Sequence, residues 1–358
     1  MKYTSQYLRD FVSGLFQKFD CPEKDANTIA EILVKAELRG ISSHGMIRVP
    51  DYVVLWEQGR IKSSPDVRIV HETPSTAVVD GDSAFGMVAA KKSMEIAIEK
   101  AKTAGTGWIS TRNSNHYGIA GYYAMMALEH DMAGIAMTNA NPLVAPTFSK
   151  SRLLGTNPVA AAIPAGNHAP FVADFATTPI ARGKLTIKGI TGEKVPHGYV
   201  QDKDGNPSHD PDILKEKGAI LPLGGSYEFG SHKGFCMGAI VDIFSAVFSG
   251  ANFGPFVPPS VPYLPVLEES TGEGLGHFFG AVRIDAFQPP ETFKSKMDEW
   301  IDTFKNANPV DGRESIIIPG EPEFENEQRL SAEGITILPQ VISKLKETAK
   351  KYNMEFKT

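Results

Sequence analysis

Apolar positions in the first 60 residues recur every three or four residues, which predicts amphipathic helices. The second of these helices ends at Gly40, a residue type that commonly terminates helices. A third helix is expected from about His44 to Gln58. Pro50 lies inside it and predicts either a helix start near Val49 or a kink.

Beyond residue 66 short apolar runs alternate with helical patterns, which favours an α/β layer architecture. Residues 185–232 are richer in glycine, proline and charge and predict an irregular excursion. Near the C-terminus we expect a strand at 316–320, then an acidic loop, then a last helix at 338–352. The remaining predicted strands are 67–72, 76–82, 107–113, 132–140, 159–165, 170–178 and 277–287, and the remaining predicted helices are 87–105, 118–131, 234–250 and 290–307.

Length and pattern together predict two domains. The chain has 358 residues, about twice the length of a common domain. We expect an N-terminal helical domain over residues 1–65, joined by the C-terminal helices from about 309 to 358. Residues 66–308 form the predicted α/β domain.

Composition excludes several classes of protein. The net charge is −6, so the chain lacks the basic excess that nucleic-acid binding requires, and we expect no nucleic-acid partner. Two cysteines, Cys21 and Cys236, make neither a disulfide framework nor a four-thiolate zinc site. The most apolar long stretch, 235–248, contains Asp242 and is too short to cross a bilayer. We therefore expect a cytoplasmic protein with no membrane association.

Familiar nucleotide-binding and hydrolase motifs are missing from the sequence. A G-x-G-x-x-G turn between a strand and a helix is absent, and so are the Walker, HExxH, CxxC and G-x-S-x-G patterns. The histidines outside the clusters described next show no metal-ligand spacing, so no metal is expected. If the chain binds a nucleotide, it does so on an unusual scaffold.

The segment 42–52, SSHGMIRVPDY, is the most suggestive cluster. His44 and Arg48 are four residues apart and share one face of a helix, which Tyr52 extends by a turn. Arginine binds a carboxylate with two parallel hydrogen bonds, and histidine exchanges protons near neutral pH. Ser43 either holds the second ring nitrogen or caps the helix. On these residues alone an ordinary exposed helix start is the commoner explanation.

A second cluster, residues 112–124, places His116 at a turn between a strand and a helix that Gly118 and Gly121 open. Such turns present backbone N–H groups to an anion. The alternative is a turn whose glycines and asparagines only satisfy unusual backbone dihedrals.

Further polar turns follow the predicted strands. Thr156 and Asn157 precede Pro158, and Asp174 ends a strand that leads to Thr177. A glycine-rich stretch with Gly224 precedes an apolar helix that begins near Lys233, an arrangement that suits phosphates. Asn-Pro turns, surface cations and flexible glycine loops are the ordinary alternatives for these segments.

Taken in this order, the clusters resemble the malate/L-lactate dehydrogenase family of the sulfolactate dehydrogenase type. The likeness covers nearly the whole chain and rests on motifs that are weak singly and specific together. It implies a non-Rossmann α/β fold with a central mixed-sheet cofactor domain and a helical domain from both termini. The motifs are SSHGMIRVPDY, NSNHYGIAGYYA, TNANPLVAP, GTNPVAAAIP, DFATTPIARGK, GSHKGFCM and IIIPGEPE.

The resemblance also implies functional residues. His44 becomes a proton donor or acceptor with Ser43 as its relay, Arg48 holds the substrate carboxylate beside Tyr52, and His116 is the alternative base. Some members carry a lysine near residue 140, where this chain has Ala140 and Asn141. Cofactor contacts are expected at Gly118, Thr156, Asn157, Pro158, Asp174, Phe175, Ala176, Thr177, Gly224, Lys233, Pro319, Gly320 and Glu321.

The implied activity is hydride transfer between a 2-hydroxy acid and a 2-oxo acid with a nicotinamide cofactor, in a homodimer. We expect (S)-malate and oxaloacetate, with NAD rather than NADP because the chain is acidic and shows no arginine cluster. A four-carbon diacid needs a second cation, for which Arg182, Lys184 and Lys233 are candidates. The alternatives are a lactate, sulfolactate, ureidoglycolate or cyclic-imine oxidoreductase of the same family, or a catalytically silent nucleotide-binding regulator.

Overall fold

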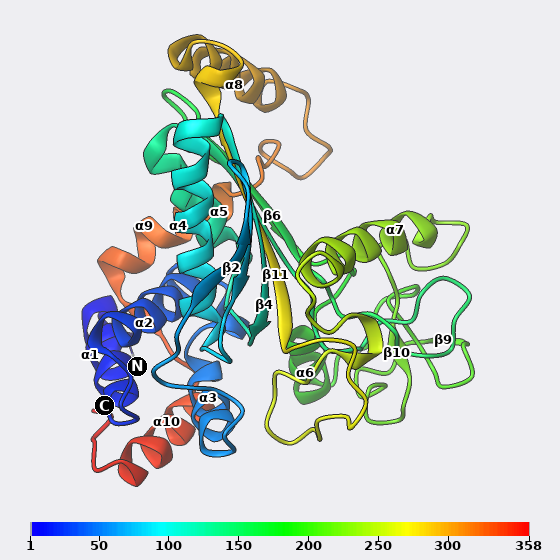
Figure 1. The fold of residues 1–358 in the computed structure, drawn as a ribbon. Coiled ribbons are helices and arrows are strands. Elements are labelled where there is room, and N and C mark those ends of the chain that lie inside the picture. The colour runs from blue at the N-terminus through cyan, green and yellow to red at the C-terminus, as the bar shows by residue number, and fades with distance from the viewer. Residues whose placement is uncertain (1, 358) are drawn as a thin grey trace.

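The structure, a computed structural model, describes residues 2–357, with the side chain of Ile190 left aside. Figure 1 shows helices on both sides of a central twisted sheet. The helices are α1 (Ser5–Gln17), α2 (Glu23–Leu38), α3 (Val49–Glu57), α4 (Gly86–Ala104), α5 (Ala120–Met126), α6 (Arg182–Thr191), α7 (Ser231–Asp242), α8 (Pro290–Lys305), α9 (Glu321–Glu333) and α10 (Pro339–Lys351). The strands are β1 (Lys2–Tyr3), β2 (Arg68–Glu72), β3 (Thr76–Asp80), β4 (Thr106–Ser114), β5 (Met132–Thr138), β6 (Val159–Ile163), β7 (Phe171–Phe175), β8 (Val200–Gln201), β9 (Pro207–Ser208), β10 (Ala219–Ile220), β11 (Leu275–Arg283) and β12 (Ile335–Thr336).

The central sheet has seven strands in the order β2-β3-β4-β11-β5-β6-β7. Only the β3–β4 pair within it is parallel, which confirms a mixed sheet and departs from the Rossmann arrangement. β11 comes late in the chain and lies in the middle, paired with β4 and β5. The register brings the C-terminal ends of β4, β5 and β7 and the N-terminal starts of β6 and β11 together at one end of the sheet, where the strands begin or finish.

One face of the sheet is covered by α4 and α5, and helices from both chain ends pack beyond them (Figure 1). α9 packs on α2 and α10 packs on α3, while β1 pairs with β12. The apolar stripes of α1, α2 and α4 bury their large side chains in one core shared with the sheet. The third helix starts at Val49 as Pro50 predicts, because proline fits the first turn of a helix.

The other face carries a smaller lobe that contains α6, α7 and the three-stranded sheet β10-β8-β9 (Figure 1). The segment predicted as an irregular excursion thus holds one helix and short strands. Its own apolar core consists of Leu143, Val144, Leu154, Ile180, Leu185, Val195, Val200, Ile213 and Ile220.

Two predictions near the C-terminus are wrong. Residues 316–320 form no strand; Pro319 only accepts one hydrogen bond from the Val172 backbone N–H, at 3.0 Å. The expected acidic loop is the helix α9. This helix has no fully buried side chain, although the partly buried Leu330 packs on the core. Glu327 pairs with Lys35 of α2 and with Arg39, the C-cap residue of α2.

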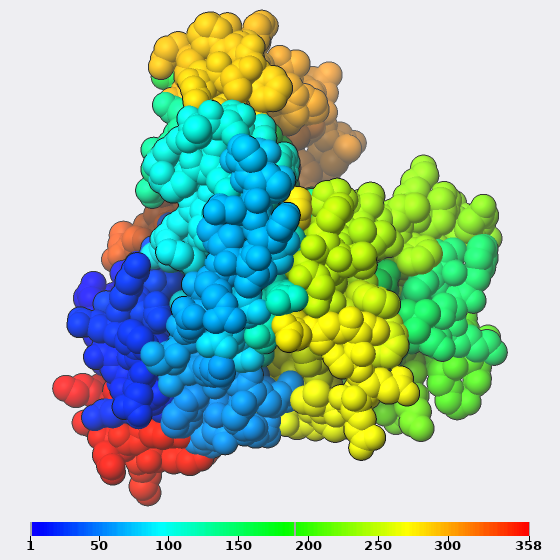
Figure 2. Space-filling model, in the orientation of Figure 1, coloured from blue at the N-terminus to red at the C-terminus, as the bar shows by residue number. Residues whose placement is uncertain are grey.

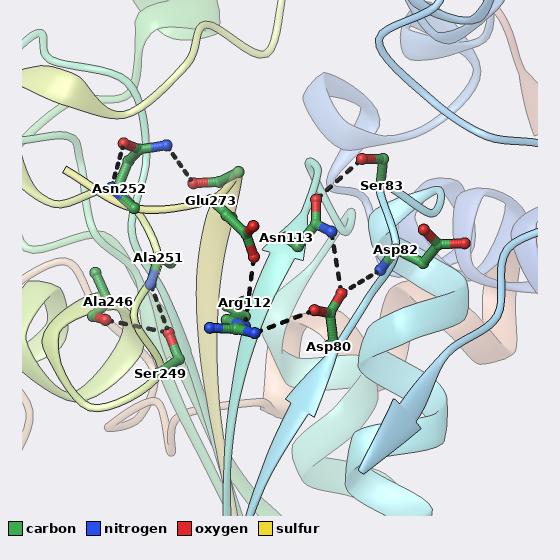
Figure 3. Close-up of polar contacts among 12 residues, drawn as sticks. Asp80, Asp82, Ser83, Arg112, Asn113, Ala246, Ser249, Ala251, Asn252 and Glu273 are labelled. Carbon is green, nitrogen blue, oxygen red and sulfur yellow. Dashed lines mark hydrogen bonds and ion pairs between the residues drawn. The ribbon is translucent and has the colours of Figure 1, made fainter. Parts of the chain in front are cut away.

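A polar clamp joins the ends of β3 and β4 to the segment that leads into β11 (Figure 3). The buried Asp80 carboxylate accepts from Asn113 Nδ2 at 3.0 Å and lies 3.4 Å from Arg112 Nη2. Arg112 Nε lies 3.5 Å from Glu273, whose carbonyl accepts from the Asn113 N–H. The clamp fixes the end of the sheet at which the predicted site residues gather. Among the described residues, none of the helices is long and apolar enough to span a membrane.

Candidate active site

The SHG segment is folded into two short 3-10 turns, Ser42–His44 and Met46–Arg48, that precede α3. The buried Glu37 carboxylate of α2 accepts the Met46 backbone N–H at 2.7 Å and holds the second turn in place. A Cβ on Gly45 would lie 2.3 Å from Glu37 Oε1, so only glycine fits there. This local packing aims His44 and Arg48 in fixed directions.

His116 follows the end of β4, where the chain passes close to the start of α4. A Cβ on Gly86 would lie 2.0 Å from the Asn115 carbonyl oxygen, so glycine at the start of α4 permits this approach. Asn115 Nδ2 also donates to the Ala84 carbonyl at 2.9 Å. The turn is therefore anchored to the same core as the SHG segment.

The structure brings the two histidines together from segments more than 70 residues apart. The rings of His44 and His116 are stacked at 21°, with their centroids 5.5 Å apart. Ser43 Oγ lies 2.9 Å from His44 Nδ1, and the Tyr52 hydroxyl lies 2.7 Å from His116 Nδ1. The Gly118 backbone N–H also donates to His116 Nδ1, at 3.4 Å.

Both imidazoles are neutral at physiological pH. Desolvation, together with the nearby Arg48 charge, lowers the pKa of His44 to about 3. The pKa of His116 is likewise well below its usual value, first through burial and then through Arg48 and His44. Both histidines are half-buried, so the pair remains accessible to a ligand.

Arg48 is held by its Nε atom, which donates to the Ser43 carbonyl at 3.0 Å. Its Nη1 lies 3.5 Å from the Asp51 carboxylate, and the side chain is 20% exposed. The guanidinium thus has donors left for an incoming carboxylate beside the two histidines.

A second group of predicted residues lies around the starts of β6 and α7. Asn157 is fully buried and bridges two segments, because its Oδ1 accepts the Ala140 N–H at 3.1 Å and its Nδ2 donates to the Gly238 carbonyl at 3.0 Å. The Thr177 backbone N–H donates to the Thr156 carbonyl at 2.9 Å. Pro158 accepts the Thr138 N–H at 3.4 Å.

Gly224 is locked into the same group, since the preceding Leu223 donates its N–H to the Thr177 carbonyl at 3.1 Å. Gly224 has a φ of +97°, and a Cβ there would lie 2.5 Å from Gly230. Lys233 is exposed in the first turn of α7, whose N-cap, Gly230, contributes no side-chain hydrogen bond.

Asp174 is the second-to-last residue of β7 and its carboxylate accepts the Gly121 N–H at 2.7 Å. Burial raises the pKa of Asp174 to about 6, although this hydrogen bond and the Arg39 charge oppose the shift. Phe175 beside it is 41% exposed, and Ala176 is half-buried.

Pro319, Gly320 and Glu321 lie along the outer edge of β7. Gly320 has a φ of +93° and packs against Val172. The Glu321 carboxylate is already engaged, because it accepts the Ile318 N–H at 3.0 Å and pairs with Lys305 at 2.7 Å. Glu321 therefore already has a hydrogen-bond donor and an ion-pair partner within the protein.

Sequence reasoning missed His277, which lies on β11 behind the site and is fully buried. Its Nδ1 lies 2.7 Å from Thr138 Oγ1 and its Nε2 lies 2.7 Å from Ser114 Oγ, so it ties β5 to β4. Its ring stacks on Tyr117, the neighbour of His116, at 4.7 Å. An isolated histidine in an apolar strand was the available signal. Within the part of the chain described, no three His, Cys, Asp or Glu residues form a metal site.

Comparison with known proteins identifies the family. The sequence profile of the malate/L-lactate dehydrogenase family matches residues 3–346. The chain belongs to this family. A malate dehydrogenase of Pyrococcus abyssi is 40% identical over 349 residues, 97% of this chain and 94% of that protein. An L-sulfolactate dehydrogenase of Methanocaldococcus jannaschii is 41% identical over 339 residues, 95% of this chain and 94% of that protein.

A solved structure gives the same answer for the fold. The malate dehydrogenase of Entamoeba histolytica superposes with a TM-score of 0.93 at 33% identity, covering 100% of this chain and 99% of that one. Membership in the malate/L-lactate dehydrogenase family makes this chain an oxidoreductase of 2-hydroxy and 2-oxo acids that uses a nicotinamide cofactor. The expected non-Rossmann fold is confirmed.

Proposed function

We propose that this protein interconverts (S)-malate and oxaloacetate with NAD. The observation that carries the proposal is the neutral His44–His116 pair beside a guanidinium with unused donors. Such an arrangement binds an acid and moves a proton at the adjacent carbon. The 40% identical relative named malate dehydrogenase supports malate as the substrate.

The residues present fit a dinucleotide. Lys233 and the uncapped start of α7 offer positive charge to a pyrophosphate, and the exposed Phe175 ring offers a flat apolar surface. We infer that Gly118, Thr156 to Pro158, Asp174 to Thr177, Gly224 and Lys233 hold the cofactor. Pro319 to Glu321 would contribute through backbone groups. When bound, the nicotinamide supplies the hydride acceptor and donor.

The chain's own residues then position the acid and handle its proton. Arg48 binds the C1 carboxylate and so fixes the C2 hydroxyl near the two imidazoles. A histidine takes the hydroxyl proton as the C–H bond breaks, so no free alkoxide forms. The bound carboxylate also cancels part of the Arg48 charge, which raises the low pKa of the histidines and so makes them stronger acceptors of the hydroxyl proton.

The hydrogen bonds favour His44 as the proton acceptor. His116 Nδ1 receives the Gly118 N–H and faces the Tyr52 hydroxyl, so the neutral His116 ring carries its proton on Nε2 and is a donor there. His44 can place its proton on Nδ1, toward Ser43, and leave Nε2 free to accept one. In this proposal Tyr52 acts on the substrate through His116.

We also propose a cytoplasmic homodimer. The exposed apolar positions Ile240, Ile243 and Val247 follow one another on α7 and its continuation and supply part of an interface. We further propose that the chain forms two domains, one from residues 1–65 with 309–358 and the other from residues 66–308. Light scattering should report about twice the chain mass of 38.8 kDa, and a monomer would contradict the dimer.

Initial rates test the activity directly. Absorbance at 340 nm should show oxaloacetate reduced more efficiently than pyruvate, sulfopyruvate or a cyclic imine, and with NADH rather than NADPH. A larger kcat/KM for pyruvate would overturn the malate assignment. Binding of NADH without turnover of any of these acids would instead indicate the silent regulator.

A further inference from the structure

The smaller lobe reaches the histidine site at the first turn of α6. A Cβ on Gly183 would lie 3.2 Å from the Ser43 Cβ, so the Gly183 backbone packs closely against the Ser43 side chain. Ser43 is the hydrogen-bond partner of His44. Arg182, the first residue of α6, therefore stands next to the proposed catalytic pair, although it comes from the other lobe.

Arg182 is held by a tyrosine rather than by a carboxylate. Its Nη2 donates to the Tyr263 hydroxyl, and its guanidinium lies 5.1 Å from the centroid of the Tyr263 ring. In the described part of the chain no carboxylate lies within ion-pair distance of Arg182. A guanidinium has five N–H donors, so several remain for a ligand.

Positive charge exceeds negative charge around this guanidinium. Arg182, Arg48 and Lys344 all act on the Asp51 carboxylate and lower its pKa, against the larger opposing effect of burial. Arg182 also adds to the burial that lowers the pKa of Arg152. Three cations thus act on one carboxylate, and Arg152 adds a further positive charge near Arg182, which suits a ligand with two negative charges.

Tyr263, which holds Arg182, belongs to a segment that is hydrogen-bonded to the residues just after α3. Gln58 Nε2 donates to the Pro262 carbonyl at 3.2 Å, and Arg60 donates to the Val261 carbonyl at 3.4 Å. Figure 2 shows this yellow segment lying against the light-blue residues near position 60. Tyr263 is thereby placed so that it can orient Arg182 toward Arg48 and Asp51.

The other two candidate cations are placed differently. Lys184 is exposed and has no ion-pair partner among the described residues. Lys233 lies in the first turn of α7, close to Gly230, among the residues that we propose hold the cofactor. Neither contributes to the charge that acts on Asp51.

We propose that Arg182 determines specificity by binding the second anionic group of the substrate, while Arg48 binds the C1 carboxylate. The substrate class is then a 2-oxo or 2-hydroxy acid with an anion on the carbon next to C2, either a carboxylate or a sulfonate. This inference rests on the proposed function, because it assigns the second contact of that same site.

The test compares Arg182→Gln with Lys184→Gln, a matched loss of charge two residues away. For Arg182→Gln, kcat/KM for oxaloacetate should fall about tenfold or more, mainly through KM, while kcat/KM for pyruvate stays within about twofold. Arg182→Lys should recover part of the loss, and Tyr263→Phe should lose a few-fold. Lys184→Gln should match the wild type for both acids.

Sulfopyruvate tests whether Arg182 also binds a sulfonate. A loss of kcat/KM with oxaloacetate or with sulfopyruvate supports the inference. An equal loss for pyruvate and the dianions, or no loss at all, would overturn it. Thermal melts check that each variant is folded. If Arg182→Gln does not fold, Tyr263→Phe still tests the inference. If the wild type does not reduce a dianion better than pyruvate, the proposed function fails. If the wild type prefers the dianion and Arg182→Gln has unchanged kinetics, only the inference about Arg182 is contradicted.

Discussion

The two walls of the active site rest on cores of very different size. The histidine wall contains Tyr52 and Tyr117, both 1% exposed, and belongs to the core that joins the sheet with helices from both chain ends. The opposite wall begins at α6 and rests on the nine-residue core of the smaller lobe. The large core holds the proposed proton-transfer groups, and the small lobe adds the cation that we propose selects among acids.

The links inside each wall differ as well. His277 joins two central strands by two 2.7 Å hydrogen bonds in a fully buried setting. In the smaller lobe Arg152 holds the chain through the carbonyls of Gly218 and Leu214, at 2.7 and 2.9 Å, and is only half-buried. Regions with few buried contacts open at lower free energy than the global fold. Chemistry and substrate discrimination should therefore respond to different mutations.

Paired cavity mutations give the largest expected effect. Leu33→Ala removes a fully buried side chain from the large core and should cost about 2–5 kcal/mol of unfolding free energy. Leu185→Ala empties part of the small core beneath Arg182 and should instead raise KM for oxaloacetate, with a smaller shift of the main melting transition. Calorimetry and initial rates distinguish the two responses. Equal loss in one shared transition would show a single cooperative unit and break the comparison.

The same contrast explains which parts of the fold the sequence predicts. Helices with an apolar stripe are placed to within a few residues, as for α8, expected at 290–307 and found at Pro290–Lys305. α9 was missed because it has no buried stripe and is held by ion pairs to α2, which lies almost 300 residues away. The central position of β11 depends on pairing partners that no local pattern encodes.

The site could be predicted only in part from local patterns. Spacing indicates that His44 and Arg48 act together, but the meeting of His44 with His116 depends on the tertiary fold. The family resemblance supplied that pairing. Neither spacing nor resemblance singled out Tyr263 or His277, since an exposed loop tyrosine and a strand histidine look ordinary in sequence.

His44→Ala tests the histidine wall. Turnover should fall on the order of a hundredfold or more, because the proposed proton acceptor is lost. His116→Ala should fall less in kcat and bind substrate or cofactor more weakly, which fluorescence titration with NADH can measure. The reverse ranking would make His116 the base, and wild-type rates for both variants would remove the proposed chemistry.

The wild-type pH profile follows from the same electrostatics. Since the pKa of His44 is lowered to about 3, its ring is already neutral throughout pH 5.5–8 and can accept a proton. We expect kcat/KM for malate oxidation to lack the inflection near 6.5 that an ordinary histidine base gives. An inflection near 6.5 that disappears in His44→Ala would contradict this environment.

Arg48→Lys should have a smaller effect, confined to function. An ammonium cannot reproduce the two parallel hydrogen bonds of a guanidinium, nor the 3.0 Å bond from Nε to the Ser43 carbonyl. We expect kcat/KM to fall roughly tenfold or more for oxaloacetate and pyruvate alike, because both carry the C1 carboxylate. Arg182→Gln is the matched contrast, since it should affect only the dianion. A thermal melt should barely change, and an unchanged kcat/KM would remove Arg48 from the site.

Asp174→Asn, near the end of β7, should give the smallest effect. Burial raises the pKa of Asp174 from its ordinary value to about 6, so the folded state binds this proton more tightly than the unfolded state. The carboxyl therefore favours folding at low pH, and this contribution is lost as the pH rises through about 6. Asparagine stays neutral and can still accept the Gly121 N–H, so the variant should melt roughly 2 °C higher than the wild type at pH 7.5 and about equally at pH 4. NADH should bind the variant more weakly if Asp174 contacts the cofactor. A variant that melts lower than the wild type at pH 7.5 would show that the ionised carboxylate stabilises this end of β7.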